Sequence, residues 1–373
     1  MNTNNTFSDL KISSPLDINI YIKNVDLSII NSLRRVIISE IKNVGFHFDP
    51  NDFSTDKDIV ILQNDSPLHN EFILKRISLI PIHVNVDELD NWNMDDYVFE
   101  INKTNTTGAL LSIYSSDFIV LKNNVVMPDL AKRFFPSDPI TKDHIIITKL
   151  HAKDSSKFVM KAKAIKANPE TSTSFGMVSK CAVEFIVDEN MANKKKQLYI
   201  KENQNKMSES DMIHQFDTIE RERYYYRNQY REPNFYKFSI TSECSIPSVI
   251  IMSRAIQVLK AKMIRFKTTE HDIINQNNLF TIIVRNESHT LGNLFQSLCF
   301  NNFIRDKSSD DDDKYQLRFI GYNKPHPLDN MIIIKIKGDK IQTPNDVKAF
   351  INEGSEYILT LLVELENQWN TIS

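Results

Sequence analysis

Two adjacent arginines, Arg34 and Arg35, are the residues of this sequence best suited to binding a charged partner. A guanidinium group carries a permanent charge and five N–H donors in a fixed fork, which suits hydrogen bonding to a carboxylate. The surrounding apolar periodicity predicts that a rigid helix presents both side chains. We therefore interpret the pair as part of a docking surface; the alternative is a solvated helix face that binds nothing.

Other residue types that perform catalysis or bind metals do not cluster in this sequence. His289 has no cysteine, histidine or carboxylate at ligand spacing, and we expect it to be structural. Residues 308–314 include four consecutive aspartates that would suit magnesium, but they are predicted to form a solvated loop. Cys181, Cys244 and Cys299 are too far apart to indicate a disulfide framework or a cysteine zinc site. We predict no catalytic residue, cofactor or metal.

The arginine pair must be positioned by a helix over residues 28–44. Apolar residues recur at helical spacing along one face of it: Ile29, Leu33, Val36, Ile37, Ile41 and Val44. Ser28 is predicted to cap the first turn, and Gly45 is predicted to end the helix in a left-handed conformation. The apolar face must be buried, which leaves the arginines on the opposite side.

The strand and helix around the arginine pair occur a second time in the chain. Residues 23–31 align without a gap with residues 285–293, at an offset of 262 residues, and a strand pattern precedes each copy. Ser28 and Thr290 fall at matching cap positions. The apolar face is kept in the second copy, but residues 296–297 (Gln-Ser) replace the two arginines. The two copies therefore have different roles on their outer surfaces.

Two long helices are predicted, over residues 247–266 and 343–369, each with an apolar seam of alternating three- and four-residue steps. A helix with such a seam packs along a second helix. We expect these two to pack together and to join the two repeats as a pseudo-two-fold dimer within one chain. The predicted interface comprises residues of both long helices and of the second short helix: Val249, Met252, Ile256, Leu259, Met263, Leu291, Leu294, Ile351, Ile358, Leu361 and Leu365.

The predicted fold class is α+β, with two dimerisation units and one insertion. The first unit comprises residues 1–84 and 235–267, the second comprises residues 268–373, and residues 85–234 form an inserted, mainly-β domain. The charged end of the insertion, residues 188–234, is expected to be a loop. Its alternating tyrosines and arginines could stack on single-stranded nucleic acid. We favour a surface loop or subunit contact, because interleaved glutamates offset the charge.

Composition narrows the possible functions. The 373 residues are 41% hydrophobic and 25% charged, with a net charge of −3. Such a chain forms two or three ordinary globular domains and has no general attraction to nucleic acid or to an anionic membrane. With seven glycines, it contains neither of the glycine-rich phosphate-binding motifs. We expect no signal peptide, no membrane span and a reducing compartment.

Five motifs resemble subunits of RNA polymerases. Residues 31–36 (NSLRRV) and 71–81 (EFILKRISLIP) resemble the two signatures of the third subunit of eukaryotic RNA polymerase II and of the archaeal D subunit. Residues 289–294 (HTLGNL), 319–328 (FIGYNKPHPL) and 366–370 (ENQWN) resemble the eleventh subunit. The bacterial alpha subunit, a homodimer, carries both HTLGN and LRR in one string. The resemblance covers nearly the whole chain, with the motifs in the family's order.

This resemblance implies a non-catalytic assembly platform of a DNA-directed RNA polymerase. In the family, paired alpha-like units bind the second-largest subunit and then the largest, often with small subunits alongside. The residues that the resemblance assigns to subunit docking are Asn31, Leu33, Arg34, Arg35, Glu71 and Arg76. Arg35 would contact the second-largest subunit. Little direct contact with nucleic acid, no membrane contact and no homodimer are expected.

The motifs of the third and eleventh subunits occur here in one chain. This fused arrangement is similar to what large cytoplasmic DNA viruses encode. It implies a virion and cytoplasmic viral-factory location, or the nucleus for a cellular homologue. Lys75 and Ser78 depart from the family's usual histidine and glycine. With Cys181 the only cysteine between residues 85 and 235, the cysteine-rich site of some family members is expected to be absent. A free-standing regulatory or nucleic-acid-binding protein on the same fold is the alternative function.

Overall fold

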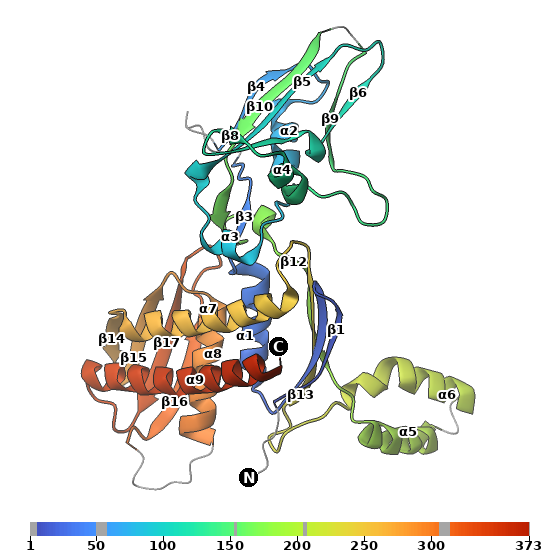
Figure 1. Ribbon diagram of the computed structural model, residues 1–373. Coiled ribbons are helices and arrows are strands. Elements are labelled where there is room, and N and C mark those ends of the chain that lie inside the picture. The colour runs from blue at the N-terminus through green and yellow to red at the C-terminus, as the bar shows by residue number, and fades with distance from the viewer. Residues whose placement is uncertain (1–5, 50–57, 153–154, 204–206, 306–313, 373) are drawn as a thin grey trace. The chain divides into compact units, whose positions relative to one another are not determined.

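The computed structural model describes residues 6–49, 58–152, 155–203, 207–305 and 314–372 (Figure 1). Helices and strands are mixed, as the α+β prediction requires. The contacts divide the chain into two compact units. Unit 1 comprises residues 1–37, 180–240 and 249–373, and unit 2 comprises residues 38–179 and 241–248.

Two four-stranded sheets share one strand order. The first runs β1 (Phe7–Ser14), β2 (Asp17–Lys23), β13 (Phe235–Ser242), β12 (Val178–Phe185). The second runs β14 (Asp272–Gln276), β15 (Leu279–Arg285), β17 (Met331–Gly338), β16 (Leu317–Asn323), and its neighbours are antiparallel. In both sheets the fourth strand along the chain is inserted between the second and third. The sequence repeat therefore extends to the topology of the sheets.

Helices follow the same strands in both repeats. α1 (Leu27–Ser39) comes after β2, and α8 (His289–Phe300) comes after β15. α7 (Ser248–Thr268) and α9 (Pro344–Ile372) come after the fourth strand of each sheet. Alternate residues of β2 and β15 are buried, because one face of each sheet must be covered by helices: Ile18, Ile20, Ile22, Phe280, Ile282 and Val284.

The backbone conformation and capping hydrogen bond at the start of α1 are repeated at the start of α8. Asn24 and Asn286, which follow β2 and β15, both adopt φ 57°, a left-handed conformation that asparagine tolerates well. Two residues later, Asp26 Oδ1 accepts a hydrogen bond from the backbone N–H of Ser28 at 2.7 Å, and Ser288 caps α8 in the same way. The predicted caps Ser28 and Thr290 are therefore wrong by two residues. Each is instead the residue whose N–H is capped.

The first helix is shorter than predicted. α1 ends at Ser39, and Val44 and Gly45 lie in β3 (Asn43–Gly45), which pairs with β11 (Ile165–Ala167). Gly45 has no positive φ, so it is not a left-handed helix cap. A Cβ at Gly45 would lie 3.1 Å from the ring of Phe175. Close packing, rather than backbone conformation, explains this glycine.

The two long helices pack against each other, as predicted (Figure 1). Trp369 Nε1 donates to Ser253 Oγ at 2.9 Å, and Lys260 pairs with Glu366. Since early residues of α7 meet late residues of α9, the helices run antiparallel. Most predicted interface residues are buried, and Val249 and Leu361 are half-buried. The buried ones are Met252, Ile256, Leu259, Met263, Leu291, Leu294, Ile351, Ile358 and Leu365.

The start of α9 is a capping box. Thr343 Oγ1 accepts from the Asp346 N–H at 3.2 Å, and Asp346 Oδ2 accepts from the Thr343 N–H at 2.8 Å. Farther along the helix, a Cβ at Gly354 would lie 2.8 Å from Cys299 Sγ. α9 therefore approaches α8 closely at this glycine.

Unit 2 is built on a five-stranded sheet in the order β4 (Ile59–Asn64), β10 (Ser156–Ala162), β5 (Tyr97–Asn105), β7 (Ile119–Lys122), β8 (Val125–Val126). β6 (Leu111–Tyr114) pairs with β9 (Ile146–Leu150), and three short helices accompany the strands: α2 (Asn70–Ser78), α3 (Val86–Asp90) and α4 (Pro128–Phe134). Aromatic side chains form much of its core, with Phe118 and Phe135 stacked at 4.6 Å between ring centroids.

The charged segment 188–234 is not the loop that the sequence predicted. It contains α5 (Glu189–Asn203) and α6 (Glu209–Gln215), followed by short helical turns. Buried Phe216 packs against Tyr199 and Tyr224, and these contacts hold the helices together. The contact-based boundaries also differ from the predicted domain limits, because β12 pairs with β13 and places residues 180–240 in unit 1.

The tight packing at Gly354 makes a stability prediction. Gly354→Val should lower the free energy of unfolding by about 1–3 kcal/mol, because the added carbons meet Cys299 and the Phe295 ring. Thermal unfolding of the full chain measures the effect. Gly108→Val is the control, since no atom lies within 4 Å of a Cβ there; equal melting temperatures for the two variants would contradict the prediction.

Candidate functional site

α1 holds the first arginine of the pair against its own helix. Arg34 is half-buried, and its Nε and Nη2 donate to Asn31 Oδ1 at 3.2 and 3.0 Å. The two residues are one helical turn apart, so the contact follows from helix geometry. Asn31 thereby orients the guanidinium group along the surface of α1.

The second arginine joins the two repeats. Arg35 is half-buried, and its Nε donates to Oγ1 of Thr290 on α8 at 3.1 Å. Thr290 is itself buried. The sequence did not predict this contact, which requires α1 and α8 to lie side by side. Its only signal was the repeat, since a two-fold axis would bring the two matching helices together.

The remaining predicted docking residues occupy different environments. Leu33 is buried on α1, so its side chain belongs to the core of unit 1. Glu71 and Arg76 are exposed on α2 in unit 2. Arg76 Nη2 donates to the carbonyl oxygen of Ile146 at 2.7 Å. The structure thus groups Asn31, Arg34 and Arg35 on α1, and Glu71 and Arg76 on α2.

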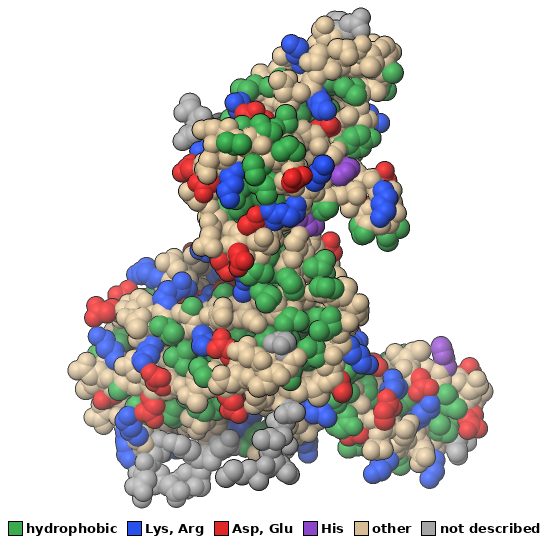
Figure 2. All heavy atoms as spheres, in the orientation of Figure 1, with side chains coloured by type: hydrophobic (Ala, Val, Ile, Leu, Met, Phe, Trp, Pro, Cys, Tyr) green, Lys and Arg blue, Asp and Glu red, His purple; other side chains and the backbone are tan. Residues whose placement is uncertain are grey.

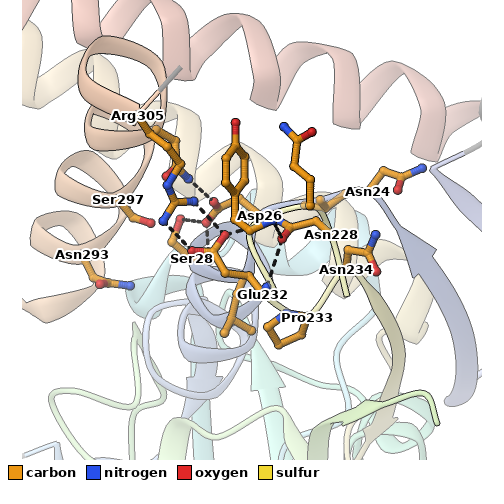
Figure 3. A pocket seen from close by; sticks show the side chains of 15 residues that line it. Asn24, Asp26, Ser28, Asn228, Glu232, Pro233, Asn234, Asn293, Ser297 and Arg305 are labelled. Atoms are coloured by element: carbon orange, nitrogen blue, oxygen red, sulfur yellow. Dashed lines mark hydrogen bonds and ion pairs between the residues drawn. The ribbon is translucent and has the colours of Figure 1, made fainter. Parts of the chain in front are cut away.

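A pocket of about 680 Å³ lies in unit 1, between the start of α1 and the end of α8 (Figure 3). Its lining is polar and rich in asparagine. Arg305 donates two hydrogen bonds to the Glu232 carboxylate, at 2.9 and 2.7 Å, and Asn301 Nδ2 donates to Asp26 Oδ2 at 2.7 Å. Both contacts link a residue of the first repeat, or of its charged segment, to a residue of the second.

Electrostatics strengthen the contact in this pocket. The hydrogen bonds from Arg305 lower the pKa of Glu232, although partial burial opposes the shift. The Arg305 guanidinium also lies over the rings of Tyr230 and Phe300, at 4.6 and 5.3 Å from their centroids. The carboxylate of Glu232 is therefore committed to an internal ion pair. The sequence analysis treated Glu232 only as an offsetting charge and missed Arg305, because their separation along the chain leaves no local signal.

The stretch of alternating tyrosines and arginines, residues 221–231, makes internal contacts within unit 1. Arg221 pairs with Glu189, Arg223 pairs with Glu220 at 3.0 Å, and Arg227 lies over the ring of Tyr225 at 4.4 Å. On the face drawn in Figure 2, basic and acidic side chains are interspersed over this unit. The geometry therefore favours the structural interpretation of the stretch over stacking on nucleic acid.

Cys181 and His289 have ordinary structural environments. Burial raises the pKa of the Cys181 thiol to about 12, although the charge of Arg34 opposes the shift. Its Sγ donates to the carbonyl oxygen of Arg34 at 3.7 Å. His289 is exposed at the start of α8, with its ring 5.9 Å from that of Tyr322. Residues 308–313 of the acidic run lie outside the described residues.

The described part of the chain has no cluster of metal-binding side chains and no helix suited to span a membrane. Within it, no three or more histidine, cysteine, aspartate or glutamate side chains are grouped to hold a metal ion. The described helices also include none with the length and apolar character needed to cross a bilayer.

Three known proteins share partial similarity with this chain. The archaeal DNA-directed RNA polymerase subunit Rpo3 of Pyrococcus furiosus is 32% identical over 123 residues, covering 32% of this chain and 40% of that protein. DNA-directed RNA polymerases IV and V subunit 3B of Arabidopsis thaliana is 28% identical over 142 residues, covering 35% and 41%. A conjugation stage-specific protein of Tetrahymena thermophila is 28% identical over 106 residues, covering 26% and 31%. The chain thus spans less than half the length of these relatives.

The chain also matches the model of a domain family. The model of the RNA polymerase Rpb3/Rpb11 dimerisation domain matches residues 19–263, which is more than half of the chain. That range includes most of β2 and all of α1 at its start, and most of α7 at its end. The chain therefore belongs to the RNA polymerase Rpb3/Rpb11 dimerisation domain family.

Proposed function

We propose that this chain is a non-catalytic assembly-platform subunit of a multisubunit DNA-directed RNA polymerase, to which the second-largest and largest subunits dock. One observation carries the proposal: α1 of a family dimerisation domain presents the Arg34–Arg35 pair, and the matching helix α8 has none. A platform in an asymmetric enzyme must offer different surfaces to two large neighbours. Loss of the arginines from one repeat achieves that difference.

The platform is an intramolecular pseudo-dimer of a third-subunit-like and an eleventh-subunit-like unit. The common strand order of the two sheets, the matching Asn24 and Asn286 conformations and the packing of α7 on α9 support this proposal. Arg35 contributes at the joint through Thr290. Arg35 is also our proposed contact with the second-largest subunit.

The two dimerisation units and the insertion remain our proposed domain organisation, with residues 1–84 and 235–267, 85–234 and 268–373 as the initial limits. Strand order supports a refinement, because β12 corresponds to β16 of the second repeat. The first unit then carries two insertions, one between α1 and β12 and one between β12 and β13. The second insertion is the charged segment with α5 and α6.

The setting that we propose is a viral polymerase, located in the virion and in cytoplasmic viral factories. The support is the resemblance of the fused arrangement to chains of large cytoplasmic DNA viruses. A cellular homologue would instead be nuclear. Small polymerase subunits are proposed as additional partners.

Arg35→Glu should reduce recovery of the second-largest subunit at least about tenfold, because reversing an interface arginine leaves a partner charge unpaired. Affinity purification of the tagged full chain from cells that make the polymerase measures recovery. Thr290→Val is the matched control: it removes the internal acceptor and keeps Arg35. Equal losses in both variants would mean that Arg35 acts only within the chain.

Native mass spectrometry of the purified enzyme should give one copy of this chain for each pair of large subunits, because the chain supplies both halves of the platform. Light scattering of the purified chain should give the mass of a single copy. Two copies per enzyme, or a chain found mostly outside the enzyme, would contradict the platform proposal.

The Glu232–Arg305 contact should make the joint between the repeats pH-dependent. The pKa of Glu232 is lowered in the folded chain, so its stabilisation is present above the unfolded pKa and is lost as pH falls through the folded value. Glu232→Gln should therefore lower the melting temperature at pH 7, and the difference should shrink below about pH 4. A difference that stayed constant down to low pH would exclude this role for the charge.

A further inference from the structure

The two long helices carry opposite charges. α7 has five basic residues and no acidic one, whereas α9 has a single basic residue, Lys348, and five acidic ones. The basic residues of α7 are Arg254, Lys260, Lys262, Arg265 and Lys267. The acidic residues of α9 are Asp346, Glu353, Glu356, Glu364 and Glu366.

The ion pairs between the helices all have the same polarity. Lys260 pairs with Glu366, and their side chains are 25% and 18% exposed. Lys267, nearer the C-terminal end of α7, pairs with Glu356. In both pairs the first repeat supplies the cation and the second supplies the carboxylate. Partial burial makes the Lys260–Glu366 pair less subject to screening than a fully exposed pair.

A buried carboxylate adds to the same polarity. Glu287 lies between β15 and α8 and is 4% exposed. Its Oε2 is 3.0 Å from Lys262 Nζ, and its other oxygen pairs with Arg265. Both cations come from α7. In the alignment of the repeats, the counterpart of Glu287 in the first repeat is Val25.

We propose that these charges make pairing of the two repeats heterotypic, so that each repeat rejects a second copy of itself. This inference rests on the proposed pseudo-dimer. Two first repeats would place one α7 against another, with lysine facing lysine and Val25 in the place of Glu287. Two second repeats would bury Glu287 beside an acidic α9, without the lysine and arginine that neutralise it.

The apolar seam alone does not provide this selectivity. Apolar residues of similar size line both helices, and they would also allow homotypic pairs of the kind that a symmetric homodimer forms. Unpaired like charges act against those alternatives. The partner that this surface fits is therefore an acidic helix of the same fold with a glutamate at the Glu287 position, and the chain carries that partner within itself.

Charge reversal in the full chain tests the proposal. Lys260→Glu with Lys267→Glu should lower the melting temperature by about 5 °C at low salt, since two attractive pairs become repulsive. Adding Glu356→Lys and Glu366→Lys should restore at least half of the loss, because the pairs are rebuilt with opposite polarity. Lys335→Glu with Lys337→Glu, on exposed positions of β17, is the charge-matched control.

Selectivity itself is measured with two differently tagged full-length chains made in the same cells. The wild-type chains should not capture one another, whereas the Lys260→Glu, Lys267→Glu chains should cross-capture several-fold more, because α7 is then nearly neutral. Equal cross-capture, absence of rescue in the fourfold variant or an equal loss in the β17 control would overturn the proposal. If the first double variant does not fold, Glu356→Lys with Glu366→Lys supplies the reciprocal reversal.

Recovery of the large polymerase subunits through the wild-type tag is scored separately. If the fourfold variant regains its melting temperature but the wild-type chain recovers no large polymerase subunits, heterotypic pairing is supported and the platform function is contradicted. If the wild-type chain recovers the large subunits but the fourfold variant does not regain its melting temperature, the platform function is supported and heterotypic pairing is contradicted.

Discussion

Burial of the apolar seam between α7 and α9 is the constraint on which the rest of unit 1 depends. Neither helix can leave its seam in water, and each also covers part of a four-stranded sheet. Trp369 illustrates the coupling: its ring is buried against Phe7 of β1 while its Nε1 donates to Ser253 of α7. These contacts come from distant parts of the chain, so they connect the first repeat to the second.

Polar contacts connect the two repeats in addition to the apolar seam, and they make the joint asymmetric. Arg35 to Thr290, Asn301 to Asp26 and Arg305 to Glu232 each connect one repeat to the other. Glu232 belongs to the charged segment between β12 and β13, for which the second repeat has only a short connection between β16 and β17. That contact forms once per chain, so the duplicated fold is asymmetric. An assembly platform with two different large neighbours needs such asymmetry.

The arginine pair shows how one motif can serve two purposes. Asn31 orients Arg34 on the same helix, whereas Arg35 donates a hydrogen bond to Thr290 of α8. A side chain that holds the joint between the repeats while contacting a neighbour would couple pairing to docking. The mechanism requires no catalytic group, since positioning of preformed surfaces is the whole of the proposed activity.

Local periodicity and spacing were enough to predict the repeat, the α+β class and the two long helices with their seams. The sequence also pointed to the arginine pair and to the family. The folded structure was needed to show that α1 ends at Ser39, that residues 188–234 contain helices, that Arg35 contacts Thr290 and that Arg305 contacts Glu232. Contacts between residues far apart in the chain leave no periodic signal, and helix ends depend on the packing around them.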